Sequence, residues 1–130
     1  MTDPTALARE AELRDLKGML KALGDIARLE IIAMLARSGE QTVTDLGQML
    51  TVNGRLISQP LVSWHISVLR RWGFVRTRRV GRLVYCSLDR TRYDSCLRLL
   101  ADLMPAVEEA QQLAQAPASD SSTDMLGMSR

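Results

Sequence analysis

The sequence has few of the residues that build metal sites or disulfide frameworks. It contains one histidine and two cysteines in 130 residues. Two cysteines do not make a disulfide framework, and a reducing cytoplasm is the default environment for such a chain. No apolar run approaches the roughly 18 residues that a membrane-spanning helix needs, and the polar start "MTDPTALARE" does not read as a secretory signal. We therefore expect a cytoplasmic protein without membrane contact.

Residue patterns that carry catalysis are also missing. The sequence has no glycine-rich phosphate loop, no paired catalytic carboxylates and no cluster of metal ligands. The single histidine, His65, has no serine, cysteine or carboxylate at a helical spacing that would form a catalytic dyad. We therefore do not expect an enzyme.

Acidic residues are scarce in one block of the chain. Residues 55–98 contain ten arginines and only two acidic residues, Asp89 and Asp94, although the whole chain has a formal net charge of only +2. The rest of the chain is therefore net acidic. A solvated charged face usually mixes both signs, so this basic block indicates a surface for a polyanion such as nucleic acid.

The first half of the chain predicts three helices. Asp3 precedes Pro4 as a helix cap, and leucines repeat at helical spacing over residues 3–24. Residues 25–39 and 42–50 predict a second helix and a short third helix. In the second helix we expect four apolar residues to face the core, namely Ile26, Leu29, Ala33 and Ala36.

A turn, a helix and a β-hairpin are predicted next. The polar segment 51–57 contains an Asn-Gly pair, which indicates a tight turn. Apolar residues at helical spacing predict a fourth helix over 58–73. β-branched residues over 74–88 predict two strands joined by a short turn.

A long final helix over 89–115 and a polar tail complete the prediction. Pro105 should kink or interrupt this helix near Met104, and the polar residues 117–130 are expected to be disordered. One domain is therefore expected over 1–116. The order ααααββα is that of a winged helix-turn-helix, a mainly α-helical fold with a β-hairpin wing (α+β). The first and last helices carry apolar stripes wider than so small a core can cover, which predicts a partner subunit.

The predicted helix 58–73 has an apolar face and a polar face. Val62, Ile66 and Leu69 recur at helical spacing and should face the core. Small hydroxyls and an amide near the N-terminal end of a helix suit the major groove of DNA, because they approach base edges closely. The helix N-terminus also favours a phosphate. From this helix we expect DNA contacts by Ser58, Gln59, Pro60, Ser63, Trp64, His65, Ser67 and Arg70.

Two residues in the middle of this helix each allow two interpretations. His65 is either a half-buried side chain bonded to a backbone group, which we favour, or a contact to a phosphate or base. Trp64 is either packed in an interface or exposed toward DNA, where its ring would meet thymine methyl groups. For Trp64 we favour exposure toward DNA.

Four arginines surround the turn of the predicted hairpin, with no acidic residue among them. A basic wing tip suits phosphates or a narrow minor groove. A loop that only adds solubility seldom carries four arginines without an acid. We therefore expect the wing to contact DNA through Arg76, Arg78, Arg79 and Arg82.

Together these segments resemble the ArsR/SmtB family of bacterial winged-helix repressors. The resemblance rests on "LKALGDIARLEIIAMLARSG", "TVTDLGQML", "SQPLVSWHISVLRRWGFV" and "RRVGRLVYCSL", and it spans residues 16–100. It implies a homodimer, joined mainly through the first and last helices, that represses by occupying double-stranded operator DNA. It also implies release of the DNA when a metal ion, a metalloid or an oxidant binds.

The effector sites of the family are missing at the matching positions. Thr42 and Thr44 stand where arsenite- and cadmium-sensing members carry a Cys-x-Cys pair, and hydroxyls do not replace thiolates. The last helix offers no histidine for a zinc site, and the second helix has no cysteine for a persulfide sensor. The turn 51–57 is also longer than is usual in the family, and Arg55 within it could reach a phosphate.

Two interpretations remain open for the cysteines. Cys86 lies on the second wing strand and Cys96 on the apolar stripe of the last helix, so each can be a small buried hydrophobe. Alternatively, the two thiols converge, within or across subunits, as a redox pair or as a site for trivalent arsenic or another thiophilic effector. That second interpretation requires accessible thiolates.

The sequence therefore predicts a dimeric, sequence-specific DNA-binding repressor of the ArsR/SmtB type. Its release from the operator would follow from a thiophilic or oxidising effector at Cys86 and Cys96. The alternatives are a winged-helix regulator with no small-molecule effector and a module that binds other proteins. The concentrated arginine block argues against the protein-binding module.

Overall fold

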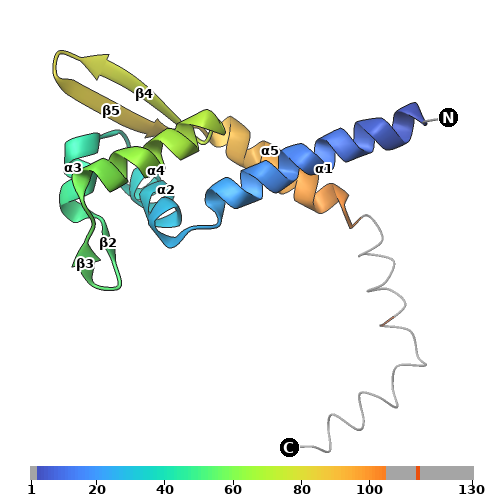
Figure 1. Ribbon diagram of the computed structural model, residues 1–130, viewed down its shortest axis with the longest axis horizontal. Helices are drawn as coiled ribbons and strands as arrows, with labels where there is room; N and C mark the ends of the chain where they lie inside the picture. The colour runs from blue at the N-terminus through green and yellow to red at the C-terminus, as the bar shows by residue number, and fades with distance from the viewer. Residues whose placement is uncertain (1–2, 105–113, 115–130) are drawn as a thin grey trace, which may run out of the picture. The chain divides into compact units, whose positions relative to one another are not determined.

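The computed structural model describes residues 3–104 and Ala114. Residues 3–99 form one compact unit, and the interactions described below lie within it. The helices and the large hairpin follow the predicted order, with three short strands in addition (Figure 1). The elements are α1 (Pro4–Leu23), α2 (Ile26–Ser38), β1 (Gln41–Thr42), α3 (Val43–Met49), β2 (Thr51–Val52), β3 (Arg55–Leu56), α4 (Gln59–Arg71), β4 (Val75–Val80), β5 (Leu83–Leu88) and α5 (Arg90–Asp102).

Side-chain caps define where the first three helices begin. Asp3 caps α1, Asp25 caps α2 and Thr42 caps α3, each by accepting a hydrogen bond of 2.9–3.1 Å from a backbone N–H of the first turn. A cap of this kind stabilises a helix by about 1 kcal/mol. Pro4 occupies the first turn of α1, where its missing N–H costs nothing. The predicted bounds of these three helices are confirmed to within one residue.

The buried face of α2 differs from the prediction. Ile26 is 67% exposed, and Leu29 and Ala36 are exposed as well, whereas Ala33 is half-buried. The buried residues of α2 are Ala27, Ile31, Met34 and Leu35, and this face packs against α4 and β5. The prediction was wrong because α2 is apolar around most of its circumference, so periodicity alone does not select the face that the tertiary contacts bury.

The predicted hairpin forms the wing, and it carries a third strand that the sequence did not predict. β4 and β5 pair antiparallel from Val75–Leu88 to Val80–Leu83, and the turn between them contains Gly81. β1 pairs with β5 on its other side, so the sheet order is β1-β5-β4. A strand of two residues has no alternating pattern to reveal it. This strand places the segment between α2 and α3 beside the wing.

The long turn before α4 is a second, smaller hairpin. β2 and β3 pair antiparallel, with Val52 opposite Arg55. Asn53 and Gly54 connect them with φ values of 55° and 77°, the left-handed conformation that a two-residue hairpin turn needs and that an Asn-Gly pair adopts readily. The predicted tight turn is confirmed, whereas the two strands around it were not predicted.

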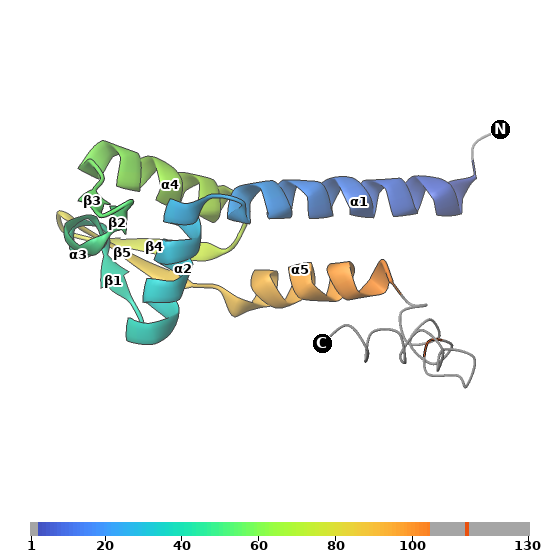
Figure 2. The same ribbon diagram turned by 90° about the horizontal axis from the view of Figure 1, so that it is seen from below.

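The core lies between the helices and the inner face of the wing. It includes Met19 of α1, Leu46 of α3 and Leu69 of α4, together with Phe74 just before the wing, all of them fully buried. Figure 2 shows α4 and α1 along one side of the domain, with α2 and the start of α5 on the other. The core thus fixes α4 beneath the wing while the outward face of α4 remains open.

The helix α5 ends close to the interruption that was predicted near Met104. α5 ends at Asp102, three residues before Pro105, as expected from the restriction that proline places on the preceding turn. Residues 105–113 of the predicted helix and the predicted disordered tail 117–130 lie outside the described residues. Among the helices that are described, none has the length and apolar character needed to cross a membrane.

Candidate nucleic-acid interface

The helix α4 presents its polar side to solvent because its apolar side fills the core. The hydroxyl of Ser58 caps the helix by accepting a hydrogen bond from the N–H of Leu61 at 3.4 Å. Val62, Ile66 and Leu69 are buried, as predicted. The remaining faces carry the predicted DNA contacts: Ser58, Gln59, Pro60, Ser63, Trp64 and Arg70 are exposed, and Ser67 is half-buried.

A groove runs between α4 and the wing. Its volume is about 250 Å³. Four residues predicted to contact DNA meet there, three from α4 and one from β4: Ser63, Ser67, Arg70 and Arg79. The other lining residues are mainly apolar: Val43, Ile66, Thr77 and Val84. The groove therefore combines hydroxyl groups, which can approach bases, with guanidinium groups, which can bind phosphates.

Gln59 is tied to the preceding helix. Its side-chain amide donates a hydrogen bond to the carbonyl oxygen of Thr44 at 3.3 Å and packs against Gly47 of α3. In this position the amide joins the two helices of the helix-turn-helix. A contact between Gln59 and an adenine would require the amide to leave Thr44.

His65 is buried, with only 5% of its surface exposed. Its Nδ1 accepts a hydrogen bond from Nη1 of Arg28 at 3.1 Å and lies 3.9 Å from the carboxylate of Asp25. Burial lowers the pKa of His65, opposed by Asp25 and reinforced by Arg28. The imidazole is therefore neutral at pH 7. The predicted hydrogen bond from His65 to a backbone group was wrong, because its partner is the side chain of Arg28, 37 residues earlier in the chain.

Trp64 is exposed over 54% of its surface, beside His65. The guanidinium of Arg28 lies 5.4 Å from the centre of the Trp64 ring, a cation–π distance. Arg28 is itself held by a 2.6 Å hydrogen bond from its Nε to the carbonyl oxygen of Ala22. Sequence patterns gave no sign of this role for Arg28, because the contacts join α2 to α4 across the fold.

Two of the four wing arginines are held by acidic partners. Arg78 donates two hydrogen bonds to the carboxylate of Glu40, at 2.9 and 2.7 Å, and lies over the ring of Tyr85. Arg76 donates to Asp89 at 2.9 Å. These hydrogen bonds lower the pKa of Glu40 and of Asp89. The wing turn itself lacks acids, but acids from outside the turn reach its arginines.

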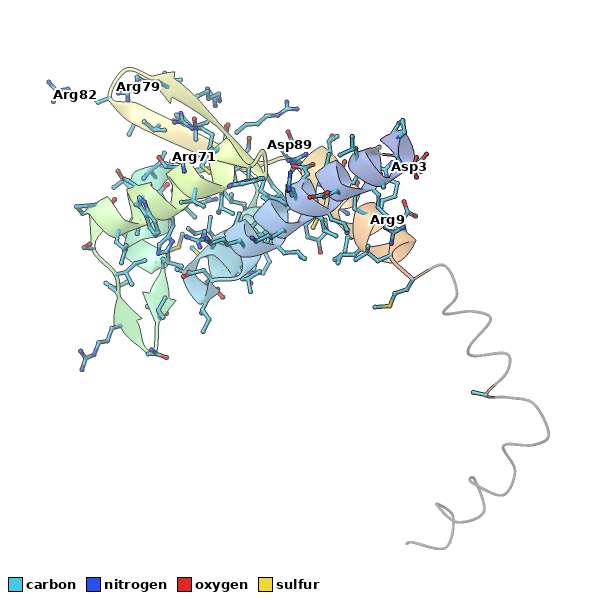
Figure 3. All side chains as sticks on the ribbon, turned by 45° about the vertical axis from the view of Figure 1, so that its right-hand side comes forward. Asp3, Arg9, Arg71, Arg79, Arg82 and Asp89 are labelled. Carbon is cyan, nitrogen blue, oxygen red and sulfur yellow. The ribbon has the colours of Figure 1, made fainter. Side chains whose placement is uncertain are left out.

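The other two wing arginines, Arg79 and Arg82, have no acidic partner within residues 3–104. Figure 3 places both at the outer end of the wing, with Arg82 extending away from the domain and Asp89 at the opposite end of the hairpin. Arg79 also faces the groove beside α4. These two side chains are therefore the wing cations available to a polyanion.

The cysteines do not form an exposed thiol site. Cys86 and Cys96 are both free and both buried. Burial raises the pKa of the Cys86 thiol to about 12, with Glu40 adding to the effect, and burial also raises the pKa of Cys96, against the opposing charge of Arg92. Both are neutral thiols at pH 7. No group of three or more potential metal ligands occurs in the described part of the chain.

The chain is similar in sequence to known regulatory proteins. Residues 25–77 match the family model described as bacterial regulatory protein, arsR family. The chain is 33% identical over 75 residues to a cadmium resistance transcriptional regulatory protein CadC homolog from Staphylococcus aureus, and the match covers 58% of each protein. It is 34% identical over 82 residues to the transcriptional activator HlyU of Vibrio cholerae, covering 63% of this chain and 70% of HlyU.

Solved structures give the same result. The crystal structure of an ArsR family transcriptional regulator superimposes with a TM-score of 0.63 at 26% identity, covering 73% of this chain and 92% of that one. Reduced HlyU from Vibrio cholerae superimposes with a TM-score of 0.56 at 31% identity, covering 74% of this chain and 95% of HlyU. The chain therefore belongs to the ArsR family of bacterial regulatory proteins and has a winged helix-turn-helix fold.

Proposed function

We propose that this protein is a transcriptional repressor that binds double-stranded operator DNA as a homodimer. The observation that carries the proposal is the groove between α4 and the wing, where Ser63, Ser67, Arg70 and Arg79 converge. In this arrangement α4 enters the major groove, and its hydroxyls approach base edges. Arg79 and Arg82 bind phosphates or the adjacent minor groove.

The smaller hairpin extends this surface. Arg55 is its only charged residue and is exposed, and β3 leads into Ser58 at the start of α4. Figure 1 shows the β2–β3 hairpin, the first turn of α4 and the turn of the wing at the same end of the domain. Arg55 therefore provides one additional phosphate contact next to the recognition helix.

Homodimer formation is supported by the leucines on α1. Leu7, Leu13 and Leu20 are exposed, as is Leu97 on α5. Several exposed leucines on two helices are typical of a surface that a partner subunit covers. A second copy of the chain is the expected partner, since most soluble oligomers are symmetric assemblies of identical subunits.

Repression is the mode of action that needs the fewest assumptions. Occupying an operator requires only DNA binding, and relatives of this chain include a transcriptional repressor SmtB homolog from Synechocystis, at 38% identity over 81 residues. Another relative, HlyU, is named as an activator. A reporter gene under the protein's own upstream region separates the two: loss of the protein raises expression if it represses and lowers expression if it activates.

Control by trivalent arsenic or an oxidant at Cys86 and Cys96 is the less supported form of this proposal. Both thiols are buried and their pKa values are raised, so neither supplies a thiolate unless the domain opens. We favour a repressor without this effector. The folded protein should therefore react slowly with Ellman's reagent, and arsenite or peroxide should leave its DNA complex intact. Rapid release that disappears in Cys86→Ser or Cys96→Ser would restore the thiol sensor.

The test of the proposed function is DNA binding measured by fluorescence anisotropy. The labelled duplex comes from the upstream region of the protein's own gene, and a shuffled duplex of the same length and composition is the control. We expect tighter binding to the natural sequence and a steep loss of affinity with salt, because several arginines displace counterions from phosphates. Equal affinity for both duplexes would contradict sequence-specific repression.

A further inference from the structure

A second hollow lies beside a neighbouring face of α4, and it shares no lining residue with the wing groove. Its volume is about 320 Å³, and its lining comes from the C-terminal half of α1, from α2 and from α4. Figure 2 shows α1 and α4 along the same side of the domain. We refer to this hollow as the tryptophan pocket. It is lined by Gly18, Lys21 and Ala22 of α1, Arg28 of α2, and Trp64, Val68, Arg71 and Trp72 at α4.

Both tryptophans of the chain line this pocket. Trp72 lies directly against Gly18, where any side chain would collide with the indole ring. Its backbone carbonyl accepts a 2.8 Å hydrogen bond from Arg92, which fixes the end of α4. Trp64 is more than half exposed. The pocket therefore has aromatic walls, one seated firmly on α1 and one open to solvent.

The charged residues that line the tryptophan pocket are basic. Lys21, Arg28 and Arg71 line it, and none of its lining residues within the described chain is acidic. Arg28 is fixed by its bonds to Ala22 and His65, whereas Lys21 and Arg71 are exposed and free to move toward a ligand. Cations beside aromatic faces suit a flat, apolar ligand that carries a negative charge.

We propose that the tryptophan pocket binds a small planar aromatic carboxylate. The ring of the ligand stacks on the indoles, and its carboxylate pairs with Lys21 and Arg71. Ligand binding also weakens DNA binding, because Trp64 lines the pocket and lies on the outward face of α4. This last step rests on the proposed function, whereas ligand binding itself does not.

Ligand binding is tested by NMR on the full chain, using the two indole N–H signals and benzoate as the probe. We expect a saturable shift of both signals with benzoate. Acetate, which has the charge without the ring, and benzyl alcohol, which has the ring without the charge, should cause little shift. An equal response to acetate or to benzyl alcohol would overturn the proposal, as would the absence of any response to benzoate.

Substitutions on α1 provide a matched pair. Lys21→Gln should weaken benzoate binding at least about fivefold, since it removes one charge-assisted hydrogen bond, and Arg71→Gln should act in the same direction. Lys17→Gln removes the same charge from an exposed position outside the pocket and should bind benzoate like the original chain. Equal weakening by Lys17→Gln and Lys21→Gln would mean that only net charge matters, and would overturn the site.

The coupling to DNA is tested by the anisotropy titration with benzoate present. Benzoate should lower DNA affinity in the original chain and in Lys17→Gln, and should have much less effect in Lys21→Gln. If the duplex shifts the indole signals and benzoate does not, the pocket belongs to the DNA interface and the proposal is wrong. If the protein binds no DNA, the proposed function fails, while the NMR titration still decides whether benzoate binds.

Discussion

The arginines on the two sides of the wing differ in whether they pair with an acidic residue. On β4, Arg76 and Arg78 point to one side and pair with Asp89 and Glu40. Arg79 points to the other side, into the groove beside α4, and Arg82 follows at the turn. The paired arginines join the wing to neighbouring segments, and the unpaired arginines are available to DNA. A count of arginines therefore overstates the surface proposed to bind DNA, because Arg76 and Arg78 are paired with acidic residues from elsewhere in the chain.

The largest effect should come from placing an acid on the groove side, where none of the described lining residues is acidic. Ser63→Glu introduces a carboxylate beside Arg79 and where DNA phosphates would approach. Like charges brought together at an interface cost several kcal/mol, so DNA affinity should fall by about a hundredfold or more. Anisotropy titration measures the loss.

The control for this variant is Thr5→Glu, which adds the same charge at the first turn of α1, far along the chain from the groove. A negative charge there suits the helix N-terminus, so folding should be unaffected and DNA affinity nearly unchanged. If both variants lose the same affinity, the groove is not the DNA-binding surface.

A substitution on the paired side of the wing should lower the stability of the protein and change its DNA affinity much less. Glu40→Gln removes the carboxylate that holds Arg78, and the melting temperature should drop slightly because exposed ion pairs contribute little. DNA affinity should stay within about twofold, or rise slightly with the added net positive charge. A large loss of DNA affinity in Glu40→Gln would show that the paired arginine also serves DNA binding.

The same ion pairs predict a pH dependence of stability. The pKa values of Glu40 and Asp89 lie below their ordinary values of 4.5 and 3.8 in the folded chain. Their contribution is therefore fully present above those ordinary values and is lost as the pH falls through the lowered ones. Melting temperature measured from pH 7 to pH 2 should decline in the acid range, and Glu40→Gln should decline less steeply. Identical curves for the two proteins would contradict the pairing.

The short hairpin should contribute to DNA binding less than the wing groove does. Arg55→Ala removes its only charge, and the salt dependence of DNA binding should decrease by about one phosphate contact per subunit at most. Thr51→Ala, in the partner strand of the same hairpin, is the control and should bind like the original chain. If Arg55→Ala weakens binding more than Ser63→Glu, the hairpin and not the wing groove dominates recognition.

The parts of this structure that depend on local patterns could be predicted from the sequence. The buried residues of α4 recur every three or four positions, and Ser58 precedes them as a cap, so both the helix and its polar face were predictable. The Asn-Gly turn was predictable for the same reason, because the two residue types favour a left-handed backbone.

The parts of the structure that depend on contacts between distant segments could not be predicted from the sequence. Glu40 reaches Arg78 from 38 residues away because β1 pairs with β5. A strand as short as β1 leaves no pattern in the local sequence from which this pairing could be predicted. His65 meets Arg28 for a similar reason, through the packing of α2 against α4. The candidate site residues were therefore predicted from residue type and helix face, whereas their hydrogen-bond and ion-pair partners depend on distant contacts and were revealed only by the fold.

The most direct test of this account compares two double variants of the wing. Arg79→Ala/Arg82→Ala and Arg76→Ala/Arg78→Ala each remove two positive charges, from the unpaired and the paired side respectively. Arg79→Ala/Arg82→Ala should reduce the salt dependence of DNA binding by about two phosphate contacts per subunit and leave the melting temperature unchanged. The second should lower the melting temperature and change the salt dependence much less. Equal loss of salt dependence in both variants would contradict the division of the wing into a DNA-binding side and a structural side.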